Sequence, residues 1–276
     1  MSKIKVMVNG APGRMASAAI GQVLADERFE LIPASLTGPE IQTAQHKIDS
    51  RKLQLIRPEV REATIKEIRG RHGTFIAVDY THPTAVNDNA EFYCRCQLPF
   101  VMGTTGGDLQ RLIETVKNSV VSAVIAPNMG RQIVGFQAMM AYAAENFPGL
   151  FKTYSMDISE SHQQNKADTS GTAKELVGYF QKLGLDFEVR DINKIRDPEA
   201  QKKEWGVPDA YLDGHAWHVI SLVSEDKTVS FTFTVKINGR DIYAKGTLEA
   251  VEFLQKKIDQ GRRGEIYSMI DVIRSG

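Results

Sequence analysis

Strand-like and helix-like segments alternate along the first half of the chain, and this alternation limits the possible folds more than any other feature. Asp108–Ser119 is typical of the helical segments, because Leu109, Leu112 and Val116 recur at the spacing of one helix face. Such alternation predicts a doubly wound parallel sheet with helices on both faces and a ligand site beyond the carboxyl ends of the strands. The predicted strands are Ile4–Val8, Phe29–Ser35, Thr74–Thr81, Pro99–Gly103 and Ser122–Ala126.

The pattern changes after Asn128. The later segments predict a second α+β domain with an open mixed or antiparallel sheet, and Asn238-Gly239 is typical of a hairpin turn. We expect a dinucleotide-binding domain at 1–128, a substrate-binding and oligomerisation domain at 129–247, and a return of 248–276 to the first domain. The segments expected in the second domain are the helices Gln132–Phe147 and Thr172–Leu183, the strands Tyr154–Ser159, Trp217–Val223, Thr228–Ile237 and Asp241–Gly246, and an extended loop at Asp191–Leu212.

Composition excludes several classes of partner. Lys+Arg and Asp+Glu both number 34, and no basic block stands out, so neither nucleic acid nor an anionic membrane is expected as a partner. The chain lacks an apolar run of membrane-spanning length, and we expect a soluble cytoplasmic protein. Cys94 and Cys96 suit neither a disulfide nor a metal pair, and no His, Cys and carboxylate residues have metal-ligand spacing, so no metal is predicted.

A glycine turn follows the first predicted strand. In Val8-Asn-Gly-Ala-Pro-Gly-Arg-Met15, one glycine allows a tight turn and the next lets a backbone approach a pyrophosphate at the start of a helix. The pattern is not the full G-x-G-x-x-G, yet its position between a strand and a helix favours a Rossmann-like nucleotide site. The predicted cofactor-binding residues here are Gly10, Ala11, Gly13, Arg14 and Met15.

Two more turns lie at predicted strand ends. One is Gly103-Thr-Thr-Gly106, and the other is Ala126-Pro-Asn-Met129. Small residues and hydroxyls there allow close approach and hydrogen bonding to a nicotinamide carboxamide. We therefore add Gly103, Thr104, Thr105, Ala126, Asn128 and Met129 to the cofactor-binding residues.

The end of the second predicted strand bears on the choice of coenzyme. NAD-selective sites carry an acid there, but Leu31-Ile-Pro-Ala-Ser-Leu-Thr-Gly38 has none. Ser35 or Thr37 could hydrogen-bond a 2′-phosphate, so NADPH is expected, with NADH as an alternative.

The segment Glu160–Ala173 carries the densest chemistry in the chain. It holds an imidazole (His162), an ammonium (Lys166) and a Ser170-Gly171-Thr172 turn leading into a helix. The lysine can neutralise a carboxylate or donate a proton, and backbone N–H groups at a helix start favour an anion. A cationic or hydrogen-bonding imidazole could balance charge in the same site. The segment therefore predicts a site for an anionic small molecule.

These motifs, in this order, resemble the 4-hydroxy-tetrahydrodipicolinate reductase (dihydrodipicolinate reductase) family over nearly the whole chain. Asp79-Tyr-Thr81 and Val101–Asp108 are most similar to its plant-type branch. The resemblance implies that His162 is the catalytic histidine, that Lys166 is the proton donor, and that Gly171 and Thr172 hold a substrate carboxylate. Ser170 and Gln163 would complete the substrate site.

The resemblance implies reduction of a cyclic dicarboxylate in the diaminopimelate route of lysine synthesis. Two departures mark this chain: Gln163 replaces the second histidine of many bacterial members, and Thr169 alone stands where they have Ala-Pro before the serine. Gln163 can donate a hydrogen bond but cannot carry charge. Two alternatives are another nicotinamide oxidoreductase of amino-acid metabolism and a non-enzymatic NAD(P)H sensor. An exposed apolar strand face predicts a homo-oligomer, either a dimer or a tetramer.

Overall fold

The computed structural model describes residues 2–276 and divides into two compact units. Unit 1 contains the described residues up to Val134 together with Asp241–Gly276, and unit 2 is Gly135–Arg240. Across the described residues, every helix is too short or too polar to cross a membrane.

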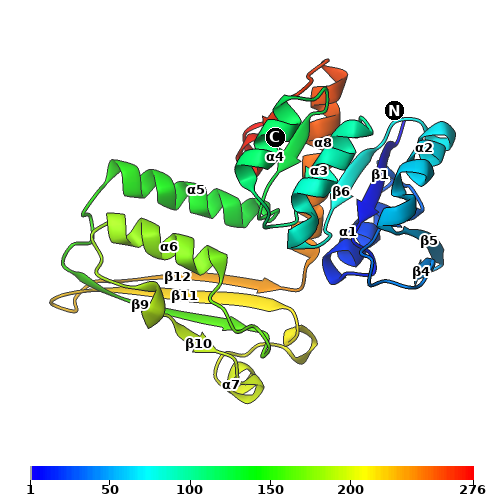
Figure 1. The fold of residues 1–276 in the computed structure, drawn as a ribbon. Coiled ribbons are helices and arrows are strands. Elements are labelled where there is room, and N and C mark those ends of the chain that lie inside the picture. The colour runs from blue at the N-terminus through cyan, green and yellow to red at the C-terminus, as the bar shows by residue number, and fades with distance from the viewer. Residues whose placement is uncertain (1) are drawn as a thin grey trace. The chain divides into compact units, whose positions relative to one another are not determined.

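Unit 1 is built on a six-stranded sheet in the order β13-β8-β7-β6-β1-β2 (Figure 1). All of its strand pairs are parallel, so the predicted α/β fold class is confirmed. Parallel strands bring the turns that follow them to one edge of the sheet, which is where the nucleotide turns were expected. The strands are β1 (Ile4–Asn9), β2 (Phe29–Leu31), β6 (Ile76–Asp79), β7 (Phe100–Met102), β8 (Ala123–Ile125) and β13 (Ile266–Tyr267).

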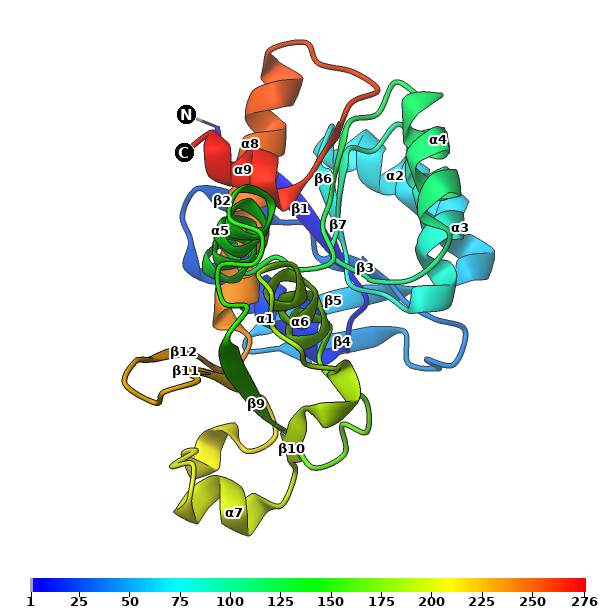
Figure 2. The ribbon, with the colours of Figure 1, turned by 90° about the vertical axis from the view of Figure 1, so that its left-hand side faces the viewer.

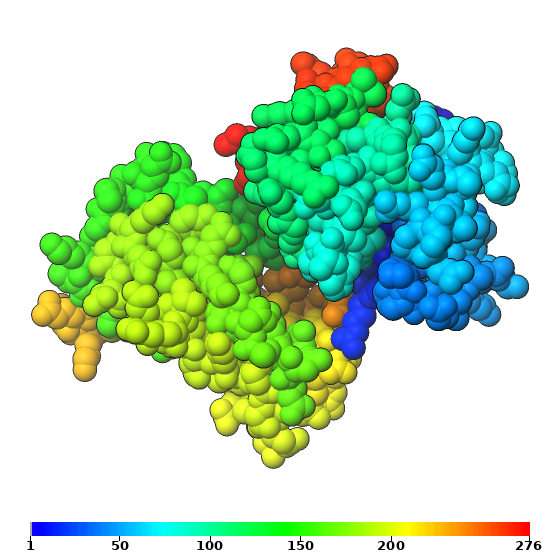
Figure 3. Space-filling view, in the orientation of Figure 1, coloured from blue at the N-terminus to red at the C-terminus, as the bar shows by residue number. Residues whose placement is uncertain are grey.

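Helices cover both faces of this sheet, as Figure 2 shows. The strand pleat explains the two layers, because Val6 and Val8 join one buried cluster while Met7 between them joins the other. Figure 3 shows two helices of the second layer, α3 and α4, side by side on the surface of unit 1. The first layer consists of α1 (Arg14–Ala25), α8 (Asp241–Asp259) and α9 (Met269–Arg274), and the second of α2 (Arg61–His72), α3 (Val86–Arg95) and α4 (Leu109–Lys117).

The predicted second strand is two strands in different sheets. Pro33 has no N–H for a ladder, and the chain leaves β2 there and pairs instead with β5. The resulting three-stranded sheet has the order β3-β5-β4, and most of it was missed in the sequence. Its strands are β3 (Ala34–Leu36), β4 (Gln45–Ile48) and β5 (Arg51–Ile56), and two short 3-10 helices, η1 (Pro58–Val60) and η2 (Pro83–Ala85), precede α2 and α3.

Unit 2 is a four-stranded sheet in the order β10-β9-β11-β12, with helices packed on one face. β9 and β11 are antiparallel, as are β11 and β12, whereas β10 runs parallel to β9. Ile158, Ile220 and Leu222 of the sheet share a buried cluster with Leu176 and Phe180 of α6. The main elements are α5 (Arg131–Asn146), β9 (Tyr154–His162), α6 (Gly171–Lys182), β10 (Asn193–Ile195), β11 (His215–Ser224) and β12 (Ser230–Asn238).

Two predictions for this region are wrong. The hairpin turn joins β11 to β12 near Asp226 and projects as gold atoms in Figure 3. The turn predicted at Asn238-Gly239 instead lies at the end of β12 and leads into α8, which begins at Asp241. Gly239 has a positive φ of 73°, which turns the chain out of the sheet without a returning strand. The predicted loop at 191–212 also contains ordered elements, namely β10, α7 (Pro198–Lys203) and η4 (Asp209–Tyr211), after η3 (Val189–Asp191).

Candidate active site

The first glycine turn of unit 1 is tightly constrained. Gly10 has a φ of 103°, and a Cβ added there would lie 2.1 Å from the carbonyl oxygen of Tyr80. A Cβ on Gly13 would lie 2.7 Å from the carbonyl oxygen of Gly10, and Gly13 is the N-cap of α1. Only glycine fits this crowded backbone, and the turn leads into a helix N-terminus, which suits a pyrophosphate.

A cavity of about 360 Å³ lies in unit 1 beside the other predicted turns. Six of the predicted cofactor residues line it: Met15, Gly103, Thr104, Thr105, Asn128 and Met129. Tyr80 and Tyr243 line it too and were not predicted. A Cβ on Gly103 would lie 2.4 Å from the ring of Tyr80, so close packing explains this glycine.

The other predicted cofactor residues lie outside this lining. Gly10, Gly13 and Arg14 belong to the first turn, while Ala11 and Ala126 are buried. The backbone N–H of Ala11 donates to Ser35 Oγ at 3.1 Å, so its backbone already has a partner within the protein.

Ser35 and Thr37 have a different role from the one expected. Ser35 is fully buried and accepts the hydrogen bond from Ala11, and the Thr37 hydroxyl donates to the Ala11 carbonyl at 3.0 Å. Both hydroxyls therefore brace the first glycine turn, and the prediction that they bind a 2′-phosphate is wrong. The cause is the change of sheet at Pro33, which turns this segment towards the interior.

An acid does lie close to the end of β3. A turn closed by the Ile41 N–H and the Gly38 carbonyl folds Glu40 back, and a Cβ on Gly38 would lie 2.2 Å from its carboxylate. The sequence pattern missed it because the turn, and not the strand, supplies the acid.

A buried carboxylate connects the turns of unit 1. Asp79, at the end of β6, accepts hydrogen bonds from Thr104 Oγ1 at 2.6 Å, from Tyr93 Oη at 2.6 Å and from Asn89 Nδ2 at 3.0 Å. The Tyr93 hydroxyl in turn accepts from Asn9 Nδ2 at 3.0 Å. Burial, reinforced by the neighbouring Asp79 carboxylate, raises the pKa of Tyr93 well above its usual value, so Tyr93 stays a donor. This network fixes the ends of β1, β6 and β7 to one another.

In unit 2, β9 ends at the predicted catalytic histidine. Alternation along the strand places Glu160 and His162 on one face, and both are buried. Glu160 Oε2 accepts from the Ser170 N–H at 3.1 Å, and Glu160 Oε1 is paired with Arg196. The carboxylate thus ties the start of α6 to the end of β9.

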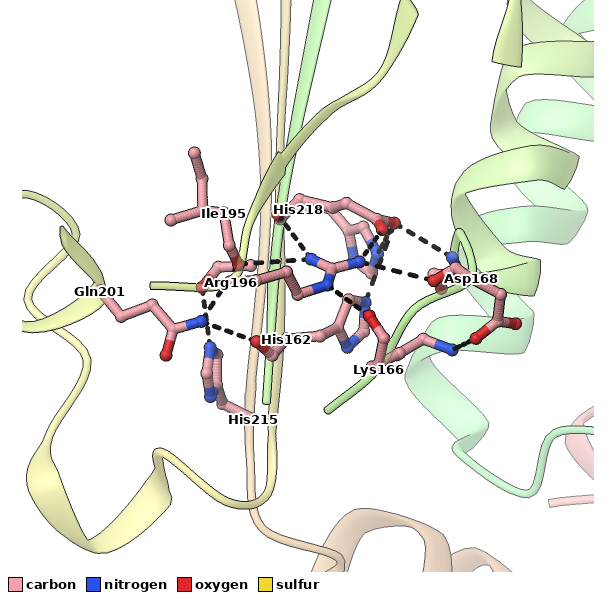
Figure 4. A network of polar contacts seen from close by, with 11 residues as sticks. His162, Lys166, Asp168, Ile195, Arg196, Gln201, His215 and His218 are labelled. Atoms are coloured by element: carbon pink, nitrogen blue, oxygen red, sulfur yellow. Dashed lines mark hydrogen bonds and ion pairs between the residues drawn. The ribbon is translucent and has the colours of Figure 1, made fainter. Parts of the chain in front are cut away.

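Arg196 comes from the segment that was predicted to be a loop. It lies in the middle of the network in Figure 4, where its guanidinium donates to the carbonyl of Glu160 at 3.2 Å and to the carbonyl of Lys166 at 2.8 Å. Gln201 of α7 donates to the carbonyl of His162 at 2.6 Å. These two side chains hold the backbone on both sides of the predicted catalytic residues, and no periodic pattern of residues indicated them.

Lys166 is positioned for contact with an anion. Its Nζ lies 2.8 Å from Asp168 Oδ1, and the Asp168 side chain is 74% exposed. Hydrogen bonding to Lys166 lowers the pKa of Asp168. Such an exposed pair contributes little to stability, so the ammonium can exchange its partner for a ligand carboxylate at small cost.

The start of α6 offers backbone donors next to this lysine. The first helical bond runs from Lys174 N–H to the Ser170 carbonyl, so the N–H groups of Gly171 and Thr172 precede the hydrogen-bond ladder of the helix. Gly171 is exposed, Thr172 and Gln163 are half-buried, and Ser170 is buried. The predicted substrate residues therefore lie in one loop, and Gly171 is its most accessible point for an anion.

His162 is neutral at ordinary pH. Burial, with smaller effects from His218, Arg196 and Lys166, lowers its pKa to about 3. Burial likewise lowers the pKa of His218 to about 4. The positive charge of the site therefore comes from lysine and arginine, and His162 is a neutral hydrogen-bonding group.

Glu160, His162 and His218 form a cluster with ligand atoms within 4.8 Å of one another. The prediction of no metal rested on sequence spacing, and spacing could not show this cluster because two strands supply it. His218 lies on the same face of β11 as the apolar Ile220 and Leu222. This alternation is visible in the sequence and could have indicated that His218 is buried. Both Glu160 oxygens already accept hydrogen bonds and Arg196 balances the charge, so these residues do not fit a divalent cation.

His215 has a structural role. One ring nitrogen contacts Ser161 Oγ at 2.7 Å and the other contacts the Tyr211 carbonyl at 3.0 Å. Both nitrogens thus have partners that hold the start of β11 in place.

A parallel dinucleotide-type sheet with glycine turns, joined to a unit with a lysine–histidine anion loop, defines a nicotinamide-dependent oxidoreductase. Two family profiles, "Dihydrodipicolinate reductase, N-terminus" and "Dihydrodipicolinate reductase, C-terminus", match residues 4–129 and 133–273. The chain belongs to the dihydrodipicolinate reductase family.

Relatives agree with this assignment, and a solved structure shares the fold. The chain is 44% identical over 273 residues to 4-hydroxy-tetrahydrodipicolinate reductase 1, chloroplastic, of Arabidopsis thaliana, covering 99% of this chain and 78% of the relative. A probable chloroplastic reductase 1 of Oryza sativa subsp. japonica is also 44% identical, covering 98% and 79%. The fold matches a dipicolinate-bound dihydrodipicolinate reductase from Paenisporosarcina sp. TG-14, with a TM-score of 0.67, 18% identity, and coverage of 97% and 98%.

The plant relatives correct one expectation. A cytoplasmic location was predicted from the absence of membrane and targeting signals. That prediction is wrong, because the plant relatives at 40 to 45% identity are named as chloroplastic.

Proposed function

We propose that this protein reduces 4-hydroxy-tetrahydrodipicolinate to tetrahydrodipicolinate in the diaminopimelate route of lysine synthesis, using a reduced nicotinamide coenzyme. The observation that carries the proposal is the loop of unit 2, where the Lys166 ammonium and the exposed N–H groups of α6 form a binding site for a small carboxylate. Support also comes from the plant relatives, which carry this activity in their names.

Lys166 is the proposed proton donor. Loss of the 4-hydroxyl as water leaves a ring carbon conjugated with an imine. Hydride addition to that carbon, which a bound reduced nicotinamide would supply, creates negative charge that must be protonated. An ammonium is acidic enough to give up a proton as that charge develops, and a substrate carboxylate in place of Asp168 would hold it nearby. His162, neutral and buried, acts as a hydrogen-bonding group that orients the substrate or the lysine.

The remaining substrate contacts are assigned to the same loop. The N–H groups of Gly171 and Thr172 and the hydroxyl of Ser170 lie at the start of α6, and the helix dipole favours a carboxylate there. Gln163 contributes a neutral donor in place of a second cationic histidine.

The coenzyme is assigned to the turns of unit 1. The tight turn at Gly10 and Gly13 suits a pyrophosphate, and the cavity lined by Thr104 and Asn128 suits a nicotinamide ribose or carboxamide. We propose that both NADPH and NADH are used. β3 itself carries no acid to repel a 2′-phosphate, and Glu40 in the following turn places a carboxylate beside Gly38 that can accept from ribose hydroxyls.

A semialdehyde dehydrogenase is the rival with a similar fold, since aspartate semialdehyde dehydrogenase II of Vibrio cholerae matches with a TM-score of 0.53 at 10% identity. That chemistry needs a reactive thiolate. Burial raises the pKa of both Cys94 and Cys96, which lie on or next to α3. The chain therefore offers no activated thiol for that reaction.

A homo-oligomer is also proposed. β12 is an edge strand of unit 2, and apolar side chains on α5 are exposed, with Met139 at 64% and Tyr142 at 63%. An unpaired strand edge and exposed apolar side chains favour association with another copy. Light scattering coupled to size-exclusion chromatography should give a mass above the monomer value of 30.7 kDa.

The direct test is a coupled assay with the purified protein. Substrate is generated in situ from pyruvate and aspartate semialdehyde by an added synthase. The decrease in absorbance of the reduced nicotinamide reports coenzyme oxidation. Oxidation should require both precursors and should be slower by at least about tenfold in Lys166→Ala. Coenzyme oxidation that is independent of the synthase, or no oxidation with a folded protein, would refute the proposed activity.

A further inference from the structure

His218 is a buried histidine of unit 2 for which the proposed reaction has no use. Neither of its ring nitrogens has a hydrogen-bond partner among the residues that the structure describes, and the Nε2 of His162 also lacks one. Leaving such groups unpaired in an apolar interior costs free energy, so a histidine at this position requires a reason beyond packing.

The two imidazoles face the same carboxylate oxygen. Glu160 Oε2 lies 3.9 Å from His162 Nε2 and 3.9 Å from His218 Nε2, which is too far for a hydrogen bond to either. The two rings pack edge to face, with their centroids 5.2 Å apart and their planes at 70°. In Figure 4, His218 lies behind Arg196.

We propose that His218 is a positioning residue, whose ring holds the ring of His162 away from Glu160 and so keeps His162 neutral and its Nε2 available to the substrate. The inference deepens the proposed function and rests on it for the role of His162. Without the edge of His218, a shift of the His162 ring by about 1 Å would bring Nε2 within hydrogen-bond distance of Glu160 Oε2. A His162 bonded to this carboxylate would be occupied and more readily protonated.

The surrounding charges agree with this role. The charged or titratable groups around the pair are Glu160 on β9, Lys166 in the following loop, Arg196 after β10, and His215 on β11. Glu160 is the only anion among these groups and favours the protonated form of His218, and the His218 ring packs edge to face against the His162 ring. Glu160 itself is held in place by Arg196 and Ser170, so the histidine ring is the part that can move.

The test measures the titration of His162 directly, in the full-length protein. The ring carbon resonances of histidine are followed by NMR against pH, and His162→Gln identifies the signal of His162. In His218→Ala the pKa of His162 should rise by roughly one to three units, since the ring gains access to an opposite charge. In His218→Leu, which keeps most of the bulk, it should stay close to the wild-type value.

A double variant separates positioning from loosened packing. If the rise in His218→Ala comes from contact with Glu160, His218→Ala combined with Glu160→Gln should reverse most of it. If the alanine variant does not fold, His218→Val can be used, because it leaves a smaller gap. It should also raise the pKa of His162, by less than His218→Ala. An unchanged His162 titration in both His218→Ala and His218→Val would overturn the proposal.

The same samples test the competing use of this cluster. If a chelator abolished wild-type activity and Zn²⁺ restored it, the cluster would be a metal centre and the positioning role would be refuted. The titration does not require turnover. A protein that fails to reduce the proposed substrate but shows the predicted rise would refute the proposed function and leave the His218 inference standing.

Discussion

The guanidinium of Arg196 binds both the backbone carbonyl and the carboxylate of Glu160, and so joins the segment after β10 to the end of β9. Glu160 is fully buried, so its charge depends on this partner. The pair determines where the loop containing Lys166 begins and ends, because Glu160 also accepts from the Ser170 N–H and Arg196 also donates to the Lys166 carbonyl.

Arg196→Ala should therefore be strongly destabilising. It leaves a buried carboxylate without its cation, which costs about 3 to 5 kcal/mol in the free energy of unfolding. Urea unfolding followed by circular dichroism measures the loss. Adding Glu160→Gln to Arg196→Ala should recover part of it, and a single-variant loss below about 1 kcal/mol would show that the pair behaves like a surface ion pair.

Lys166→Ala should lower turnover by at least about tenfold, because a placed general acid contributes roughly two to four orders of magnitude. Coenzyme affinity, measured by fluorescence of the bound nicotinamide, should remain near the wild-type value. Asp168→Asn is the matched control, since the Asp168 side chain is exposed and its carboxylate pairs with the lysine. Equal losses in both variants would argue against a proton-donor role for Lys166.

Gly10→Ala should abolish coenzyme binding, because the added Cβ meets the Tyr80 carbonyl and the residue must keep a φ of 103°. Gly21→Ala in α1 is the control, since a Cβ there meets nothing within 4 Å. It should stabilise the helix by about 1 kcal/mol and leave coenzyme affinity unchanged. Titration of NADPH into each variant decides the matter, and normal binding by Gly10→Ala would remove the first turn from the site.

Glu40→Gln should change coenzyme preference. Removing the carboxylate beside Gly38 relieves repulsion of a 2′-phosphate and removes an acceptor for ribose hydroxyls. The KM for NADPH should fall and the KM for NADH should rise. Glu30→Gln, an exposed change on β2, should alter neither, and parallel changes in both KM values of Glu40→Gln would contradict the assignment.

Stability should fall as the pH is lowered from about 6.5 towards 4. His162 and His218 have pKa values lowered to about 3 and about 4, so in this window the unfolded chain binds protons that the folded chain does not. Each histidine then contributes roughly 1.4 kcal/mol per pH unit to the loss. Urea midpoints at pH 7 and pH 5 measure it, and His218→Leu should show a smaller pH dependence than the wild type.

Local patterns predicted much of unit 1. The period of apolar residues and the glycine turns indicated the parallel sheet and the position of its turns, because both signals lie within a few neighbouring residues. The break at Pro33 was also visible, but its consequence depended on pairing of Ala34–Leu36 with β5. That pairing turned Ser35 inward, and no local pattern could show it.

The unit 2 site was predictable only where its residues are contiguous. His162, Lys166 and the Ser170–Thr172 turn share one segment, so their chemistry could be recognised together. Arg196 and His218 reach Glu160 from other elements, and such contacts arise from strand order, which sequence periodicity does not encode. Burial, with smaller effects of these neighbouring side chains, lowers the pKa of His162, which favours the hydrogen-bonding form over the cationic form among the two that were expected.

The hydrogen bonds that converge on Asp79 have a consequence for coenzyme affinity. Thr104, Tyr93 and, through Tyr93, Asn9 are fixed within the protein itself. The turns at the ends of β1, β6 and β7 are thus preorganised, and little conformational entropy remains to be lost when a dinucleotide is captured. Weakening Tyr93 or Asn9 should then slow capture and loosen retention, although neither side chain lines the cavity assigned to the coenzyme.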